Sequence, residues 1–315
     1  MRAVMLDRAS LGDDQLDFSA LEAEFDELVS FDGTAEEQTA DRLAGFDVWV
    51  TNKVRITAQH FAANSGVRLV LVVATGTDNV DLDAAKSAGV AVCNVRAYGI
   101  PSVAQHTMML ILALATGFER YRDDVRAGAW SQSQRFCLMD HPAMELSGKT
   151  LGVMGAGDLG GAVAALGEAF GMRVVLWDRQ GTGAPGRLPL DQLLQQVDVM
   201  SIHCPLTPAT RGIIDAQALA TMKPTAFVIN TARGGIVDED ALCEALDNGV
   251  IAGAAFDVLS TEPPPVEHPL LKPRSNFILT PHSAWLARES RQRMIRELAL
   301  NMAAFKAGEP RNRVV

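Results

Sequence analysis

The sequence predicts an α/β protein built around a doubly wound parallel sheet, and three observations support this fold class. Short β-branched segments alternate with helical patterns along most of the 315 residues. A glycine-rich motif joins one such segment to a helical pattern. Several later segments end in polar residues, and parallel sheets bind ligands at the carboxyl ends of their strands. At roughly 150 residues per domain, the chain has room for about two domains.

The first third of the chain predicts a small sheet followed by a long helix. Strands are expected at residues 2–6, 46–50, 69–73 and 90–93. The acidic stretch 13–37 is expected to be a solvated helix face. Residues 101–121 predict a single helix, because Pro101 suits a first helical position and apolar residues recur at intervals of three and four.

The remainder predicts a second, larger sheet. Strands are expected at residues 151–154, 173–177, 197–203, 225–230, 251–258 and 277–280. A helix over residues 284–306 closes the chain.

Composition excludes several classes of protein. The net charge of −10 argues against nucleic acid or an anionic membrane as a partner, since both need basic patches. The four cysteines form no CxxC pair, which favours reduced thiols and a cytoplasmic location. Asp7 interrupts the start where a signal peptide would remain apolar, and the apolar run 108–115 is too short to cross a bilayer. The histidines are scattered, so no metal site is expected.

The strongest local motif is Gly155-x-Gly157-x-x-Gly160, between an apolar strand and a helix. The first glycine permits a tight turn, the second lets the backbone approach a pyrophosphate, and the third allows close packing of helix and strand. Backbone N–H groups at the start of the helix then face the anion. The motif predicts a dinucleotide-binding site.

Asp178 ends the next predicted strand and bears on the choice of cofactor. A carboxylate there accepts hydrogen bonds from both ribose hydroxyls of NAD and repels the additional phosphate of NADP. NAD is therefore expected rather than NADP. The neighbouring Arg179 keeps NADP open, because a guanidinium binds a phosphate well. A purely structural role for Asp178, at the end of a strand, is the other alternative.

Three later segments end near a residue with catalytic chemistry. Arg233 precedes a glycine and follows an apolar strand, and its guanidinium fits a carboxylate or paired 2-keto acid oxygens. Glu262 is followed by three prolines, and His282 lies between the last strand and the last helix. Taken singly, each has an ordinary alternative: an ion pair, a solvated loop residue or a packed histidine.

Taken together, these three residues suit the reduction of a ketone by hydride transfer. Imidazole titrates near neutrality, so His282 is expected to donate the proton that the developing alkoxide needs. A carboxylate at Glu262 would favour the protonated ring and fix its orientation. Arg233 would hold the substrate carboxylate and polarise the carbonyl. Asp257 is expected either to accept from the nicotinamide amide or to be purely structural.

The chain resembles the D-isomer-specific 2-hydroxyacid dehydrogenases nearly from end to end. The matching segments are ATGTDNVDLDAAK, SVAQHT, the glycine motif, HCPLTPAT, NTARGG, AAFDV, TEPPP and TPHSAW. The resemblance implies a Rossmann-type nucleotide domain over residues 99–284. This domain is inserted into a smaller flavodoxin-like α/β substrate domain formed by residues 1–98 and 285–315. Catalysis is expected in the cleft between the two.

The resemblance also assigns roles to residues. Arg233, Glu262 and His282 match the catalytic group, and Thr75 and Gly76 match positions that offer backbone groups to the substrate carboxylate. Besides the three motif glycines, the positions that match nucleotide contacts are Asp158, Leu159, Asp178, Pro205, Thr210, Thr231, Ala232 and Asp257, with Thr107 as a weaker candidate. Two features depart from the family pattern: Arg96-Ala97 replaces the usual proline and glycine, and Asp158 adds negative charge at the cradle.

Substrate and assembly are also expectations from the resemblance. The segment 130–138 and Trp285 resemble members that interconvert hydroxypyruvate and D-glycerate and also take glyoxylate. The alternatives are a 2-keto acid reductase of broader specificity and a non-enzymatic, NAD-sensing corepressor-like scaffold. A homodimer through the nucleotide domain is expected, with the helix that starts at Pro101 either partly at the interface or in the core.

Overall fold

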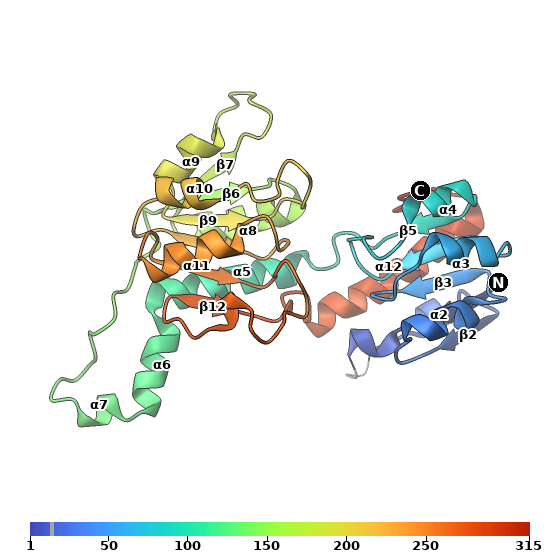
Figure 1. Cartoon of the computed structure of the whole chain (residues 1–315), viewed down its shortest axis with the longest axis horizontal. Coiled ribbons are helices and arrows are strands. Elements are labelled where there is room, and N and C mark those ends of the chain that lie inside the picture. Colours follow the sequence, from blue (N-terminus) through green and yellow to red (C-terminus); the bar gives the residue numbers. More distant parts are fainter. Residues whose placement is uncertain (13–15) are drawn as a thin grey trace. The chain divides into compact units, whose positions relative to one another are not determined.

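The computed structural model describes residues 1–12 and 16–315, and the chain folds into two compact units. The first unit comprises Met1–Gly99 and Leu286–Val315, and the second comprises Ile100–Trp285 (Figure 1). Each unit contains a parallel sheet with helices on its faces. The predicted α/β class is confirmed.

Within the described residues, the first unit has a five-stranded parallel sheet in the order β2-β1-β3-β4-β5. This order is that of a flavodoxin-like sheet. Its strands are β1 (Arg2–Met5), β2 (Glu27–Ser30), β3 (Val48–Thr51), β4 (Leu69–Val72) and β5 (Ala91–Cys93). Its helices are η1 (Arg8–Leu11), α1 (Ser19–Glu22), α2 (Glu36–Leu43), α3 (Ala58–Ala63), α4 (Leu82–Ser87) and α12 (Arg288–Ala307).

The acidic stretch 13–37 is not the helix face that the sequence predicts. Among the residues described there, it holds the short helix α1, the edge strand β2 and the start of α2. Residues 13–15 of this stretch lie outside the described residues. β2 is partly exposed and pairs with β1 at the edge of the sheet, so it lacks the apolar run typical of a buried parallel strand.

Within the described residues, the second unit has a seven-stranded parallel sheet in the order β12-β11-β10-β9-β6-β7-β8. The strand order reverses between β6 and β9, as in a Rossmann-type sheet, and a crevice for ligands opens at such a point. Its strands are β6 (Thr150–Met154), β7 (Arg173–Trp177), β8 (Arg187–Leu188), β9 (Val199–Ile202), β10 (Phe227–Asn230), β11 (Gly253–Phe256) and β12 (Phe277–Leu279). The predicted doubly wound sheet is confirmed, with the two-residue strand β8 added at its edge.

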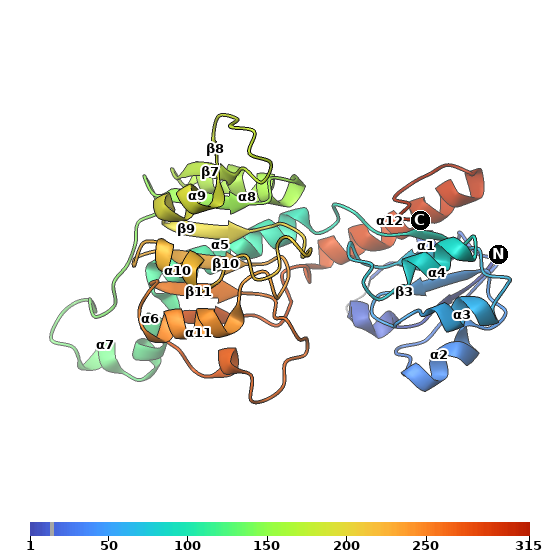
Figure 2. The ribbon, with the colours of Figure 1, turned by 45° about the horizontal axis from the view of Figure 1, so that its top comes forward.

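Two layers of helices bury this sheet (Figure 2). α5 and α8 pack against one face, over side chains such as Val153 and Ile229. α9, α10 and α11 pack against the other face, over Met200 and Val228. The helices of this unit are α5 (Ile100–Thr116), α6 (Phe118–Arg126), α7 (Ala129–Gln132), α8 (Asp158–Ala169), α9 (Leu190–Gln196), α10 (Ala216–Thr221), α11 (Glu239–Asp247) and η2 (Pro269–Leu271).

The single helix predicted over residues 101–121 is two helices. Gly117 adopts a left-handed backbone with φ of 64°, which ends α5 and starts α6 at an angle of 64°. α6 carries no buried residue and leaves the sheet, whereas α5 is buried along one side. No single described helix has the length and apolar composition for a membrane span, although α5 and α6 taken together meet that test.

Candidate active site

The predicted site residues of the second unit gather at one edge of its sheet. β6, β7, β9, β10, β11 and β12 are all parallel, so their carboxyl ends lie on the same side. The glycine motif follows β6, Asp178 follows β7, and Arg233 follows β10. Asp257 and Glu262 follow β11, and His282 follows β12.

The glycine turn after β6 is packed where the motif requires it and open where a phosphate would lie. A Cβ at Gly155, where φ is +109°, would stand 2.7 Å from the backbone of His203 and Cys204. A Cβ at Gly160 would stand 1.8 Å from the carbonyl oxygen of Gly155. Gly157 precedes the first residue of α8 and has no heavy atom within 4 Å of its Cβ position.

Asp178 is a buried carboxylate held by its own loop. It accepts hydrogen bonds from the backbone N–H of Gly183 at 2.7 Å and from the hydroxyl of Thr182 at 3.1 Å. The bond from the Gly183 N–H is the largest cause that lowers the pKa of the Asp178 carboxyl below its ordinary value, so the group is ionised at neutral pH. The adjacent Arg179 is exposed. A negative charge therefore lies at the end of β7.

The threonines predicted as nucleotide contacts are engaged with other protein groups. The hydroxyls of Thr107 and Thr231 lie 2.9 Å apart, and both residues are buried. The hydroxyl of Thr210 donates to the carbonyl oxygen of Pro205 at 2.7 Å and is wholly buried. These hydrogen bonds stabilise the loops that follow β9 and β10, so the threonines have a structural role there. Their nucleotide contacts stay predictions.

Glu262 and His282 form a direct pair. Oε2 of Glu262 lies 2.6 Å from Nδ1 of His282, and Oε1 accepts the N–H of Leu259 at 2.9 Å. The carboxylate is thus fixed on its own loop and orients the imidazole. Because Nδ1 faces Glu262, Nε2 is the ring nitrogen left for another partner. Both side chains are about one-third exposed.

The turn that carries His282 is held from beneath by Asp257. Asp257 is buried, and its carboxylate accepts the N–H of Ser283 at 2.8 Å and the N–H of Ala284 at 2.9 Å. The indole N–H of Trp285 donates to the carbonyl oxygen of His282 at 3.0 Å. Asp257 therefore has a structural function in the turn, and its predicted contact with nicotinamide remains a prediction.

Arg233 lies on the loop next to that of Glu262. A Cβ at the following residue, Gly234, would stand 1.9 Å from the backbone carbon of Leu259, the residue whose N–H binds Glu262. The half-buried Arg233 donates from Nη1 to the carbonyl oxygen of Ala232 at 2.7 Å. The guanidinium has five N–H donors, so this bond leaves most of the fork for a ligand.

Thr75 and Gly76 belong to the first unit, in the loop after β4. The hydroxyl of Thr75 donates to the carbonyl oxygen of Val95 at 2.9 Å. The side-chain amide of Asn94 donates to the carbonyl oxygen of Thr75 at 2.7 Å. Nε of Arg96 approaches Oδ1 of Asn94 at 3.3 Å, so the unusual arginine is tied to the same loop.

Comparison with known proteins shows the family to which this chain belongs. Residues 108–284 match the D-isomer specific 2-hydroxyacid dehydrogenase, NAD binding domain. The chain is 40% identical to glycerate dehydrogenase of Methylorubrum extorquens, over 99% of this chain and 98% of that one. The chain belongs to the D-isomer specific 2-hydroxyacid dehydrogenases. It is also 35% identical to hydroxypyruvate reductase of Blautia hydrogenotrophica, over 99% of both chains.

Among solved structures, an acyclic imino acid reductase in complex with NADPH and D-Arg aligns with a TM-score of 0.89. The two chains are 26% identical, and the alignment covers 100% of each. That protein, which has a similar fold, therefore binds NADPH. In this chain the negative charge of Asp178 is the feature that bears on the choice between NAD and NADP.

The dehydrogenase's second unit fits its cofactor, NAD, at the glycine turn. The open space at Gly157 and the N–H groups at the start of α8 suit a pyrophosphate, and the ionised Asp178 suits ribose hydroxyls. Leu159 is half-buried and Ala232 is buried, whereas Asp158 is exposed in the first turn of α8. Its charge therefore faces solvent, where it interacts favourably with the helix dipole.

Sequence reasoning missed three residues near the pair formed by Glu262 and His282. Thr280 lies two residues before His282 and Ser283 directly follows it, and both hydrogen-bond to Asp257. His106 from α5 hydrogen-bonds to Thr280 across 174 positions of sequence. The available signal was that His106 and Thr280 both lie within segments already recognised as motifs.

His203, also within such a segment, has a buried Nδ1 atom with no hydrogen-bond partner among the described residues. Its Nε2 lies 2.8 Å from the hydroxyl of Ser201. Burial lowers the pKa of His203 to about 4, from an ordinary value of 6.5. The ring is therefore neutral beneath the glycine turn at physiological pH.

Acidification is expected to destabilise the dehydrogenase through His203. Between pH 6.5 and pH 4 the unfolded chain binds this proton and the folded chain does not, so the free energy of unfolding falls by up to about 3 kcal/mol. This stability is fully present above pH 6.5. Denaturant titrations at pH 7 and pH 4.5 should show a smaller loss for His203→Gln than for the wild type. Equal losses in the two proteins would contradict the expectation.

Proposed function

We propose that this dehydrogenase reversibly reduces hydroxypyruvate to D-glycerate with NADH, and that it also reduces glyoxylate. The observation that carries the proposal is the 2.6 Å contact between Glu262 and His282, on the same sheet edge as the glycine turn and Arg233. This arrangement supports a role for His282 as an oriented acid and for Arg233 as a substrate-binding guanidinium. We assign nucleotide binding to the second unit and part of substrate binding, through Thr75 and Gly76, to the first.

The proposed mechanism uses each residue according to its chemistry. Arg233 binds the substrate carboxylate and polarises the carbonyl group. NADH supplies a hydride to the carbonyl carbon when it is bound. His282 donates a proton from Nε2 to the carbonyl oxygen and becomes neutral, while Glu262 accepts the Nδ1–H and holds the ring in orientation for the transfer. In the oxidative direction His282 accepts the proton from the hydroxyl group.

The choice of substrate rests on the relatives. Those named glycerate dehydrogenase and hydroxypyruvate reductase align with nearly the whole chain. Other relatives are named glyoxylate reductase, such as that of Aeropyrum pernix, which is 41% identical over 77% of this chain. A reductase of broader specificity for 2-keto acids is therefore the second candidate.

A panel assay tests the proposal. Purified protein is mixed with NADH and one 2-keto acid at a time, and absorbance of NADH is followed. We expect the largest kcat/KM with hydroxypyruvate and a lower value with glyoxylate. Comparable values across pyruvate, 2-ketobutyrate and hydroxypyruvate would favour the broader reductase, and no turnover despite NADH binding would favour the sensing scaffold. The same assay with NADPH should give a much lower kcat/KM, because the charge of Asp178 opposes a 2′-phosphate.

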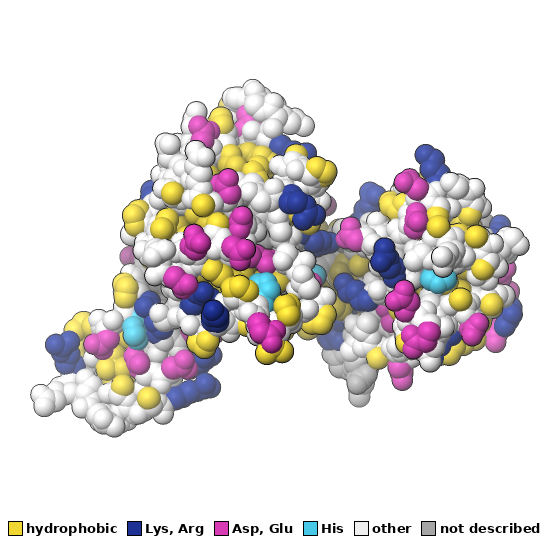
Figure 3. Space-filling model, viewed as in Figure 1, with side chains coloured by type: hydrophobic (Ala, Val, Ile, Leu, Met, Phe, Trp, Pro, Cys, Tyr) yellow, Lys and Arg dark blue, Asp and Glu magenta, His cyan; other side chains and the backbone are white. Residues whose placement is uncertain are grey.

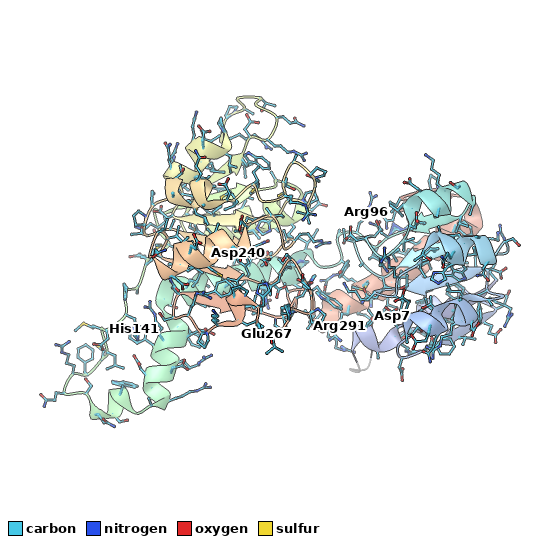
Figure 4. The ribbon with its side chains drawn as sticks, viewed as in Figure 1. Asp7, Arg96, His141, Asp240, Glu267 and Arg291 are labelled. Atoms are coloured by element: carbon cyan, nitrogen blue, oxygen red, sulfur yellow. The ribbon has the colours of Figure 1, made fainter. Side chains whose placement is uncertain are left out.

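The proposal includes a homodimer and a cytoplasmic location. α6, α7 and residues 133–144 form an arm of the second unit, on which His141 lies (Figure 4). The rings of Tyr121 and His141 pack together there, and the hydroxyl of Tyr121 donates to the carbonyl oxygen of His141. Large apolar side chains of this arm are exposed, including Trp130 at 51% and Phe136 at 91%, and hydrophobic atoms appear on it in Figure 3. Burial against a second copy would remove them from water. Light scattering measures the mass directly, and the four free cysteines fit a reducing compartment.

A further inference from the structure

A chain of hydrogen bonds runs from helix α5 to the turn of His282. Nε2 of His106 lies 2.9 Å from the hydroxyl of Thr280, and this hydroxyl lies 2.5 Å from Oδ1 of Asp257. The side chain of His106 is 16% exposed and that of Asp257 is 2% exposed. Water therefore has little access to the bonds that connect these three residues.

The direction of each bond follows from the groups present. Both oxygens of Asp257 accept backbone N–H groups, so the hydroxyl of Thr280 donates its one proton to this acceptor group. The oxygen of Thr280 must then accept from His106, which places a proton on Nε2 of that ring. Burial lowers the pKa of His106, against the opposing effect of Asp257, so the ring is neutral and its tautomer matters.

The series of hydrogen bonds ends at backbone N–H groups next to His282, the proposed proton donor. Asp257 accepts the N–H groups of Ser283 and Ala284, the two residues that follow His282. α5 holds this segment a second time, because the hydroxyl of Ser102 donates to the carbonyl oxygen of Ala284 at 2.6 Å. His282 itself has a left-handed backbone, with φ of 52°, which side-chain-bearing residues rarely adopt unless their surroundings impose it.

We propose that His106, in the tautomer protonated at Nε2, is a positioning residue for 2-keto acid reduction: it donates to Thr280 and thereby orients Asp257 and the turn that carries His282. This inference rests on the proposed role of His282 as proton donor. His106 acts through the turn and transfers no proton to the substrate.

Two substitutions of His106 test the proposed positioning role, because they place an N–H donor at different ring positions. The amide nitrogen of glutamine occupies nearly the position of Nε2, whereas that of asparagine occupies nearly the position of Nδ1. His106→Gln is therefore expected to retain kcat within about threefold. His106→Asn is expected to lower kcat about tenfold, since a small displacement of a reacting group costs that much or more. NADH affinity, measured by fluorescence titration, should change by less than about twofold in both.

A second variant guards against misfolding. Thr280→Val has almost the same shape but no hydroxyl, and it should lower kcat as much as His106→Asn does. The double variant that combines His106→Asn with Thr280→Val should be no slower than the slower of the two single variants. Both changes interrupt the same series of hydrogen bonds, so their effects should not add. Any of three results would overturn the inference. The losses of kcat could multiply in the double variant, Thr280→Val could retain full kcat, or His106→Gln and His106→Asn could have equal kcat. Failure of the proposed function is distinct, because then the wild type itself would not reduce 2-keto acids.

Discussion

Replacing His282 with alanine is expected to lower kcat for 2-keto acid reduction about a thousandfold. The substitution removes the proposed proton donor, and a positioned acid of this kind contributes about 10²–10⁴-fold to a rate. NADH affinity should stay within about twofold, because the glycine turn and Asp178 are on other loops. Steady-state rates from NADH absorbance and a fluorescence titration of NADH provide the two measurements.

A matched control separates this effect from the loss of any histidine–carboxylate pair. His268 and Glu239 form another such pair in the second unit, with 3.1 Å between Nε2 and Oε2. His268→Gln keeps a hydrogen-bonding group and should leave kcat within about twofold. Equal losses of kcat and NADH affinity in His282→Ala would mean that the histidine maintains the site rather than donates the proton.

The parts of the fold that sequence predicted well are those with local causes. β6 is a buried run of mostly apolar residues, and Gly155 and Gly160 occupy positions where a Cβ would collide with backbone. Such constraints leave a readable pattern of residues. β8 has only two residues and β2 is a partly exposed edge strand, so neither produces an apolar run of the usual length. The break of the long helix depended on the positive φ of Gly117, and an isolated glycine within a helical pattern is often tolerated.

The candidate site shows the same division. Parallel strands end on one edge, which is why sequence order alone indicated that Arg233, Glu262 and His282 lie on neighbouring loops. Contacts between distant segments have no comparable pattern. His106 meets Thr280 across 174 positions, and neither Pro101 nor the apolar spacing that predicts a helix over residues 101–121 indicates this contact. The structural role of Asp257 likewise became visible only when its hydrogen-bond donors in the segment 280–284 were known.

Replacing Arg233 with alanine is expected to lower kcat/KM for 2-keto acids about a thousandfold, equal to about 4 kcal/mol of transition-state stabilisation. The change removes both the proposed anchor for the substrate carboxylate and the charge proposed to polarise the carbonyl. Arg233→Lys should recover only part of the loss, because an ammonium group lacks the planar fork that binds two oxygens at once. Progress curves at several substrate concentrations, with NADH saturating, give the values.

Arg274 offers the matched control for this prediction. Its guanidinium makes two bonds to Asp247, at 2.6 and 3.0 Å, so its role is visibly structural. Arg274→Ala should lower the unfolding temperature modestly and leave kcat/KM within about twofold. Guanidinium ion added to Arg233→Ala should restore part of its activity, since the vacated space accepts the same planar cation, and it should do nothing for Arg274→Ala. An Arg233→Ala enzyme with wild-type kcat/KM would mean that the substrate carboxylate is bound elsewhere, and the backbone N–H groups of Thr75 and Gly76 would then have to carry that binding without a charge.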